Sequence, residues 1–295
     1  MGYCLLLIAL FAGAVKGYCG KKTSGYANGL QDAIFANIIR MLFCVLIGFL
    51  LLFLSGDLVH LMPSRNVLLI GMLSGISTAV FVVTWLICVK RSAYMMVDIF
   101  LMLGVLIPLI ASNILFHEEI KLTQWVGIAV LFTAVVIICS YNNSIKARLT
   151  PASLALLILC GAANGIADFS QKLFTKCVPD GSAAAFNFYT YLFAAFVLFL
   201  TFTATRKAGN ASESSGTKQI FGYILIMSVC LFVNSYFKTL ASGYLGAVLL
   251  YPLNQGCALI LSAVMAAVLF KEKLTAKAII GILTAFAGLL IINLL

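Results

Sequence analysis

The sequence predicts an all-α integral membrane protein with ten transmembrane helices, arranged as two inverted five-helix repeats. Three observations support this fold class. Of the 295 residues, 63% are hydrophobic and only 9% are charged, against about 25% charged residues in a soluble domain. The chain divides into ten apolar runs, and crossing a bilayer takes about 20 such residues in a helix. Finally, the end of the first half of the chain is repeated at the end of the second half.

The ten apolar runs take up most of the chain, and the short connections between them leave no room for an extramembrane catalytic domain. The runs are continuously apolar, whereas the strands of a membrane barrel would alternate apolar and polar residues. We therefore expect helices over 2–20, 33–54, 66–89, 93–116, 122–141, 152–173, 182–204, 219–240, 244–270 and 275–294.

The first two runs differ in what they carry. No basic segment precedes run 2–20, so we expect a retained helix rather than a signal peptide.

Run 33–54 contains two polar residues, Asn37 and Arg40, one turn apart. The long stem of Arg40 either snorkels to the cytoplasmic surface or turns to a cavity, where its planar fork would bind a carboxylate or a phosphate. Lys16, near the cytoplasmic end of the first run, poses the same question.

Charged side chains within a membrane are costly and often functional. Run 93–116 carries Asp98, and run 152–173 carries Asn164 and Asp168 one turn apart on the same face. As functional residues, these acids would bind a proton or an amine. The structural alternative pairs Asp168 with Lys172 at i+4, as a local ion pair. Lys238, close to the outer interface, is expected to snorkel to the membrane surface.

Aromatic and amide side chains supply the remaining candidates for a substrate site. Trp85 in run 66–89 and Tyr189 in run 182–204 belong to aromatic positions that either stack on a planar substrate or pack against other helices. Run 244–270 opens with the most polar cluster of any run, which includes Tyr251, Asn254 and Gln255. Its Pro252 lacks a backbone donor and would free carbonyl groups for a buried cavity.

The repeat lies at the ends of the two halves. Residues 115–138 and 269–292 align without a gap at an offset of 154 positions, with eight identities in 24. The identities include the pairs Phe116/Phe270, Glu118/Glu272 and Gly127/Gly281. We expect a first repeat over 1–141, a cytoplasmic linker over 142–151 and a second repeat over 152–295. Five helices per repeat make the two halves inverted, and such carriers place the substrate near the midplane between the halves.

The positive charge of the chain, +10 overall, is unevenly distributed between the two sides of the membrane. Thirteen basic residues fall in the loops on one side and five on the other. By the positive-inside rule the first side is cytoplasmic, so both termini are expected outside, in a bacterial cytoplasmic membrane. The charge thus indicates topology and not a nucleic-acid partner.

Cysteine and histidine offer little chemistry. The nine cysteines are scattered singly, and the two histidines, His60 and His117, fall in loops. These spacings indicate neither a disulfide framework nor a metal site, and no catalytic constellation can be built from them. We expect no enzyme activity, no metal and no cofactor.

The repeated segment resembles the EamA-type branch of the drug/metabolite transporter superfamily, in which each half ends in a loop Leu-x-x-Glu-x-(Leu/Ile) followed by a helix with a Gly. The matching residues are Leu115, Glu118, Ile120 and Gly127, and Leu269, Glu272, Leu274 and Gly281. Arg40 also looks like the family pattern. The resemblance implies ten helices and transport without specifying a substrate. The small multidrug relatives rely on an acid in the first helix, which this chain lacks, so their proton-coupled mechanism is not implied.

We interpret the chain as a secondary transporter that moves a small polar metabolite by alternating access, as an exporter or exchanger. Intramembrane basic residues outnumber the acids, which favours an amino acid or a related zwitterion or anion, with an amine as a further possibility. Partners would be the substrate, a coupling proton or cation and the lipid bilayer, in a monomer or homodimer. The alternatives are a flippase for a lipid-linked sugar and a non-transporting membrane scaffold.

Overall fold

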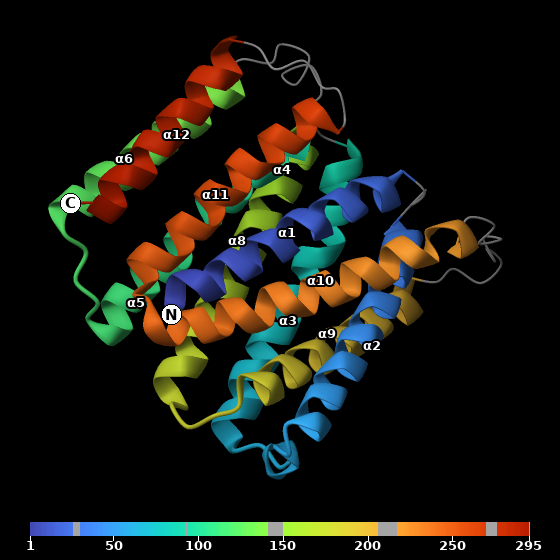
Figure 1. Cartoon of the computed structure of the whole chain (residues 1–295). Helices are drawn as coiled ribbons and strands as arrows, with labels where there is room; N and C mark the ends of the chain where they lie inside the picture. Colours follow the sequence, from blue (N-terminus) through green and yellow to red (C-terminus); the bar gives the residue numbers. More distant parts are fainter. Residues whose placement is uncertain (26–29, 92–93, 141–149, 206–216, 270–275, 295) are drawn as a thin grey trace.

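The computed structural model describes residues 1–25, 30–91, 94–140, 150–205, 217–269 and 276–294 (Figure 1). The regular structure of these residues is entirely helical. The first half contains α1 (Gly2–Ser24), α2 (Leu30–Leu54), the short 3-10 helix η1 (Leu58–Leu61), α3 (Arg65–Arg91), α4 (Tyr94–Gly104), α5 (Leu106–Phe116) and α6 (Leu122–Ser140). The second half contains α8 (Pro151–Cys177), α9 (Ala183–Thr205), α10 (Thr217–Tyr244), α11 (Ala247–Val268) and α12 (Ala276–Leu294).

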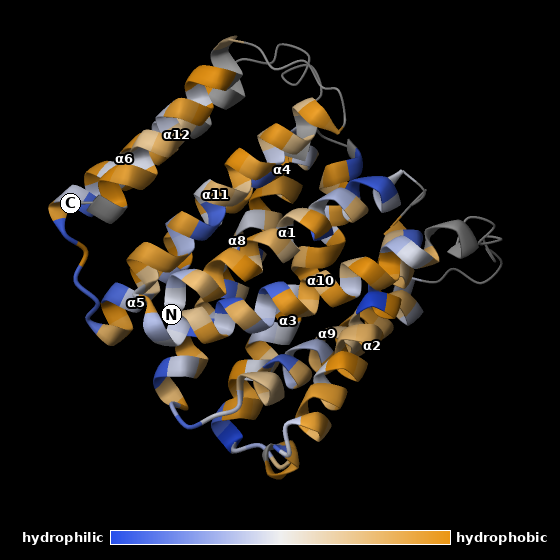
Figure 2. Ribbon diagram, viewed as in Figure 1, coloured by the Kyte–Doolittle hydropathy of each residue, from blue (hydrophilic) through white to orange (hydrophobic). Residues whose placement is uncertain are grey.

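The helices have the lengths and composition of membrane spans. Seven of the described helices are long and apolar enough to cross a bilayer, and the shorter apolar segments Phe100–Phe116, Leu122–Ala134 and Ile279–Ile292 account for the other expected spans. Hydrophobic residues dominate the helices, whereas the loop after α5 is hydrophilic (Figure 2). Large apolar side chains such as Leu54 and Phe196 are exposed on the outside of the bundle, as lipid-facing positions require.

Run 93–116, expected as one helix, is divided into α4 and α5. Pro108 has no N–H to donate to the carbonyl of Gly104, four residues earlier, and its ring opposes a regular helix there. The chain tightens at this point, where Val105 N–H donates to Met102 O at 3.1 Å. Gly104 also packs directly on the backbone of α8, because a Cβ on Gly104 would overlap the carbonyl of Gly161. The break and the glycines together bring α4 against α8.

The packing of the two halves follows the repeat. If α1 corresponds to α8 and α3 to α10, then the observed contacts of α1 with α10 and of α8 with α3 are equivalent. The pairs α2–α9 and α6–α12 also pack together, each between corresponding helices. The chain termini lie at the same end of the bundle (Figure 1). The molecule is therefore two five-helix units joined face to face, with equivalent helix contacts on both sides of the interface.

The pair α6 and α12 lies at one side of the bundle, next to α11 (Figure 1). These helices approach closely at Gly127 and Gly288: a Cβ on Gly127 would lie 2.9 Å from Gly288 O, and one on Gly288 would lie 3.0 Å from Gly127 O. Gly127 is the glycine of the repeated motif, and its backbone contact with α12 explains why that position carries no side chain.

Candidate functional site

A cavity of about 100 Å³ lies between the two halves. Its wall is built by α1, α3 and α4 from the first half and by α8, α9, α10 and α11 from the second. Holding one water molecule takes about 10–15 Å³ of such space, so this cavity has room for a small solute. Six of the ten residues expected at a substrate site lie on this wall, namely Trp85, Asp98, Asn164, Asp168, Asn254 and Gln255.

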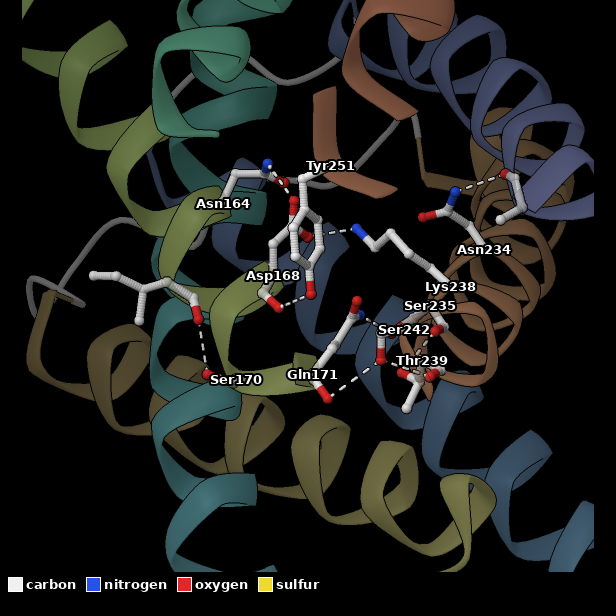
Figure 3. A network of polar contacts seen from close by, with 12 residues as sticks. Asn164, Asp168, Ser170, Gln171, Asn234, Ser235, Lys238, Thr239, Ser242 and Tyr251 are labelled. Atoms are coloured by element: carbon white, nitrogen blue, oxygen red, sulfur yellow. Dashed lines mark hydrogen bonds and ion pairs between the residues drawn. The ribbon is translucent and has the colours of Figure 1, made fainter. Parts of the chain in front are cut away.

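An ion pair between Asp168 and Lys238 joins α8 to α10 at the cavity (Figure 3). Asp168 Oδ1 lies 2.5 Å from Lys238 Nζ, and the two side chains are 1% and 8% exposed. Asn164 Nδ2 donates to the second carboxylate oxygen of Asp168 at 3.4 Å. From α11, the hydroxyl of Tyr251 donates to the backbone carbonyl of Asp168 at 2.6 Å. The carboxylate is thus held by groups from α8 and α10, and α11 holds the backbone at the same residue.

This pairing corrects two expectations. The structural alternative paired Asp168 with Lys172 on its own helix, and Lys238 was expected to reach the membrane surface. Lys238 is instead 7% exposed and turned inward from α10, while Lys172 has other partners. A buried ammonium keeps its charge only when a carboxylate or several acceptors compensate it, and α8 offers that carboxylate directly across the helix contact.

Asp98 occupies the same cavity from the side of α4. It is 7% exposed, and the hydroxyl of Ser262 on α11 lies next to its carboxyl group. Lys16 on α1 also faces the cavity, within electrostatic reach of Asp98, Asp168 and Lys238, and its ammonium lies 5.9 Å from the centroid of the Phe81 ring. Two acids and two bases therefore face each other on the described wall, so their formal charges cancel.

Arg40 and Asn37 are not on the cavity wall. Arg40 is only 2% exposed, and its Nη1 donates to Asn37 Oδ1 at 2.6 Å. Asn37 in turn donates to the carbonyls of Ala33 and, across to α3, of Val82. Arg40 therefore neither snorkels nor faces the cavity, the two alternatives left open by the sequence. It lies near Tyr191, which is itself part of the wall.

Tyr189 and the neighbouring aromatic residues of α9 also lie elsewhere. The hydroxyl of Tyr189 donates to the carbonyl of Leu61 at 2.7 Å, and Phe186 stacks on Phe174 with ring centroids 4.5 Å apart. These side chains pack between helices, as the structural alternative had it. Tyr251 lies behind the wall, and Pro252 borders a small apolar space with Met102 instead of the polar cavity.

The cavity wall also contains polar residues that were not expected there from the sequence. Gln171 and Asn234 were not singled out, and Lys238 was expected at the membrane surface. Gln171 follows Asn164 and Asp168 at i+7 and i+3 on α8, and Asn234 precedes Lys238 by one turn on α10. Asn234 also donates to the carbonyl of Ala9 at 2.6 Å, which fixes α10 to α1. Helical spacing was the available signal, since residues at i, i+4 and i+7 share one face.

One end of the bundle is held together by Glu118, which follows α5. His117 adopts the left-handed conformation (φ 52°) that ends this helix and turns the chain. Glu118 Oε2 accepts the N–H of Ala247, at the start of α11, at 2.8 Å. Its Oε1 lies 2.9 Å from Lys172 Nζ and 3.4 Å from Lys176 Nζ, both on α8. We call Glu118, Lys172 and Ala247 the Glu118 clasp.

The Glu118 clasp also reaches α10, because Lys172 Nζ donates to the carbonyls of Ser242 and Leu245 near the end of that helix. Glu118 precedes α6 in the chain, but the helix whose start it caps is α11. Although burial raises the pKa of Glu118, the amide of Ala247 and the ammonium of Lys172 lower it more, so the pKa lies below its ordinary value. Glu272, the counterpart of Glu118, lies outside the described residues.

The cavity and the Glu118 clasp lie at different depths. The clasp joins the end of α8 to the start of α11, whereas the wall residues of α11 run from Asn254 to Met265, toward its other end. On α8 and α10 the wall residues lie between mid-helix and the clasp, from Asn164 to Gln171 and from Leu231 to Lys238. The cavity thus lies at mid-depth, and the Glu118 clasp lies beyond it at one end of the bundle.

Comparison with known proteins agrees with this architecture. A solved structure described only as "Crystal structure of protein" superposes on this chain with a TM-score of 0.72 at 12% sequence identity, over 100% of this chain and 98% of that chain. No curated protein matches the sequence. The profile of the EamA-like transporter family matches twice, over residues 1–140 and 151–294. With both of its halves matched, the chain belongs to the EamA-like transporter family, whose members are multi-pass membrane transporters and not enzymes.

Proposed function

We propose that this transporter moves a small zwitterion, an amino acid or a close relative, by alternating access. The observation that carries the proposal is the buried Asp168–Lys238 pair, which joins α8 and α10 of the second half on the wall of the cavity between the repeats. With Asp98 and Lys16 on the same wall, the described site has no net formal charge while offering both an anion and a cation.

Electrostatics favours a zwitterion over a simple ion. Breaking a buried ion pair by removing one partner leaves an uncompensated charge, at a cost of about 3–5 kcal/mol. A monovalent cation that displaced Lys238 from Asp168 would leave the lysine in that condition. A zwitterion brings both charges, so its ammonium can bind Asp168 while its carboxylate binds the released Lys238. The pair is exchanged for two new pairs, and the low-dielectric site stays neutral.

The Glu118 clasp supports the alternating-access part of the proposal. It holds α8, α10 and α11 together at one end of the bundle, beyond the cavity at mid-depth. By the distribution of basic residues the clasped end is outside, so the clasp would close the cavity on that side and leave access from the cytoplasm. A carrier that alternates must open this end, which requires the clasp to part in the second state.

The test is counterflow exchange of radiolabelled amino acids in proteoliposomes that contain the purified protein. We expect exchange of at least one small amino acid, and a loss of about a hundredfold or more in Asp168→Asn and in Lys238→Gln. The exposed loop residues Asp180 and Lys121 offer matched controls, since Asp180→Asn and Lys121→Gln remove the same charges away from the cavity. Undiminished exchange in both cavity variants, or no exchange of any amino acid by the wild type, would refute the proposal.

A further inference from the structure

Gln171 lies one turn beyond Asp168 on α8, is 5% exposed and belongs to the cavity wall. The ion pair does not use its side chain. Nitrogen and oxygen of a glutamine amide are nearly indistinguishable by shape, so the group that faces the cavity has to be assigned from the hydrogen bonds around it. Here a chain of bonds, anchored on backbone carbonyls, makes that assignment.

The chain of bonds begins at Asn187 on α9. Asn187 Nδ2 donates to the carbonyl of Ala183 at 2.8 Å, so its side-chain oxygen must be the other atom of the amide. That oxygen accepts from Ser235 Oγ at 2.6 Å, which uses the only proton of the serine hydroxyl. Ser235 Oγ can then only accept from Gln171, and the partner at 3.1 Å is Gln171 Nε2. A flipped Gln171 would set two acceptors against each other.

The orientation of Gln171 leaves its carbonyl oxygen, Oε1, turned away from Ser235. This oxygen is buried and accepts no hydrogen bond from any group in the described part of the chain. Figure 3 shows it pointing toward the space beside the Asp168 carboxylate and the Lys238 ammonium. An oriented acceptor without a protein donor, next to a carboxylate, has the composition of a site for a cationic N–H donor.

We propose that Gln171 Oε1 and the Asp168 carboxylate form the subsite for the substrate's ammonium group, and this assignment rests on the zwitterion transport proposed above. The ammonium takes the place that the Lys238 amine now fills, and Lys238 turns to the substrate's carboxylate. An –NH₃⁺ group has three donors, enough for both acceptors. A hydroxyl group in its place has one donor and no charge. A hydrogen atom in its place has no hydrogen-bond donor and no charge.

The subsite therefore makes Gln171 a specificity-determining residue for amino acids against the corresponding hydroxy and deamino acids. The probes are three matched trios. They are L-alanine, L-lactate and propanoate; L-leucine, L-2-hydroxy-4-methylpentanoate and 4-methylpentanoate; and L-phenylalanine, L-phenyllactate and 3-phenylpropanoate. Binding to purified protein is measured by titration calorimetry. For the trio that fits, we expect the wild type to bind the amino acid at least about tenfold more tightly than its deamino analogue, as one charge-assisted hydrogen bond implies.

Three variants separate recognition from a structural role. Gln171→Met keeps the size of the side chain but replaces the amide oxygen by a weakly accepting thioether. We expect it to reduce the preference for the amino acid about tenfold, leaving what the Asp168 carboxylate contributes, while binding of the deamino acid is unchanged. Gln171→Glu keeps an acceptor and should retain the preference. Gln31→Met makes the same change at an amide that donates to Thr205 O, remote from the cavity wall, and should behave as the wild type.

The outcomes distinguish this inference from the function on which it rests. If amino acids bind but Gln171→Met keeps the preference, or weakens both ligands equally, the subsite assignment is wrong and the transport proposal stands. The same holds if the wild type binds all three members of a trio equally. If the wild type binds no amino acid of any trio, the transport proposal itself fails, and the subsite with it.

Discussion

At the scale of single residues, the position of Asp168 shows how a buried carboxyl group is compensated by its neighbours. Its two carboxylate oxygens receive Lys238 and Asn164, while Tyr251 donates to its backbone carbonyl. None of these partners is next to it in the sequence, and two belong to other helices. Placing the carboxylate therefore depends on α8, α10 and α11 being assembled, which makes the site sensitive to any movement between them.

The ion pair leads to a first prediction, on stability. Asp168→Asn and Lys238→Met should each lower the free energy of unfolding by about 3–5 kcal/mol, because each leaves one buried charge without its counterion. The double variant should cost less than either single one, since both charges are then gone. Chemical unfolding in detergent micelles measures the cycle. Strictly additive effects would show that the two side chains do not interact in solution.

The sequence could give the depth of each polar residue but not its direction around the helix. Four wall residues could be predicted because they lie well inside apolar runs, where a polar side chain is costly and is often functional. They are Asp98, Asn164, Asp168 and Asn254. Arg40 lies equally deep, yet it donates to Asn37 on the same helix, which in turn donates to α3. Which side of a helix meets the cavity depends on the neighbouring helices, and these are set by packing far along the chain.

At the scale of elements, the Glu118 clasp holds four segments with one carboxylate. It satisfies an N–H at the start of α11 and compensates the ammonium of Lys172, which in turn satisfies carbonyls at the end of α10. Negative charge at a helix start and positive charge at a helix end are both favourable arrangements. Since these contacts join three helices near one end of the bundle, that end can open only when they break.

The depressed pKa of Glu118 gives the second prediction, on pH. A carboxyl group with a lower pKa in the folded state stabilises the fold above its unfolded pKa of about 4.3, and this contribution is lost as pH falls through the folded pKa. Glu118→Gln should lower stability by about 1–3 kcal/mol at pH 7, and its deficit relative to the wild type should shrink below about pH 4. Thermal unfolding between about pH 3 and pH 7 measures both.

The neighbouring residue supplies the control for the pH experiment. Glu119 is exposed, so Glu119→Gln removes the same charge outside the clasp and should leave the pH profile of stability unchanged. A deficit of Glu118→Gln that stays constant down to about pH 3 would mean that ionisation of Glu118 is not what stabilises this end of the bundle.

The third prediction concerns the broken span formed by α4 and α5. Gly161→Ala should destabilise the protein by about 1–3 kcal/mol or more, since the new Cβ would overlap the backbone carbonyl of Phe100 and push α4 away from α8. Gly222→Ala is the matched control, because no atom lies within 4 Å of its Cβ position on α10. Replacing Gly222 in a helix should stabilise by up to about 1 kcal/mol. Thermal unfolding distinguishes the two, and equal effects would contradict the close packing of α4 on α8.

The ends of most helices were predictable from the sequence to within a few residues, because apolar runs stop at charged or polar loops. The division of run 93–116 was not predicted, although Pro108 was visible. A proline within a helix can be accommodated, as Pro252 is inside α11, so its effect depends on what surrounds it. At Gly104 the backbone of α8 lies against the chain, and that contact is a property of the folded bundle.

At the scale of the whole molecule, the repeat carried most of the predictable information. Two halves of five helices imply an inverted pair, and the equivalent contacts α1–α10 and α3–α8 follow once the halves face each other. What the repeat could not give is the state of the carrier. Two inverted halves can pack with either end open, and in the described residues the Glu118 clasp, which joins helix ends on one side of the cavity, marks that end as closed.

The last prediction concerns which side of the membrane reaches the cavity. Ala258 lies on the wall, so Ala258→Cys, in a background with the nine native cysteines replaced, places a thiol there. With the clasped end outside, a membrane-impermeant thiol reagent should label this cysteine from the cytoplasmic face and much more slowly from the outer face. Adding Glu118→Gln should speed labelling from outside, because the lost carboxylate frees the ends of α8 and α11 to separate. Tags on both termini should report outside in the same vesicles.

Two outcomes would contradict this prediction. Labelling from the outer face alone, with both termini inside, would reverse the assigned topology without affecting the clasp. Labelling that Glu118→Gln leaves unchanged would show that the clasp does not control access to the cavity.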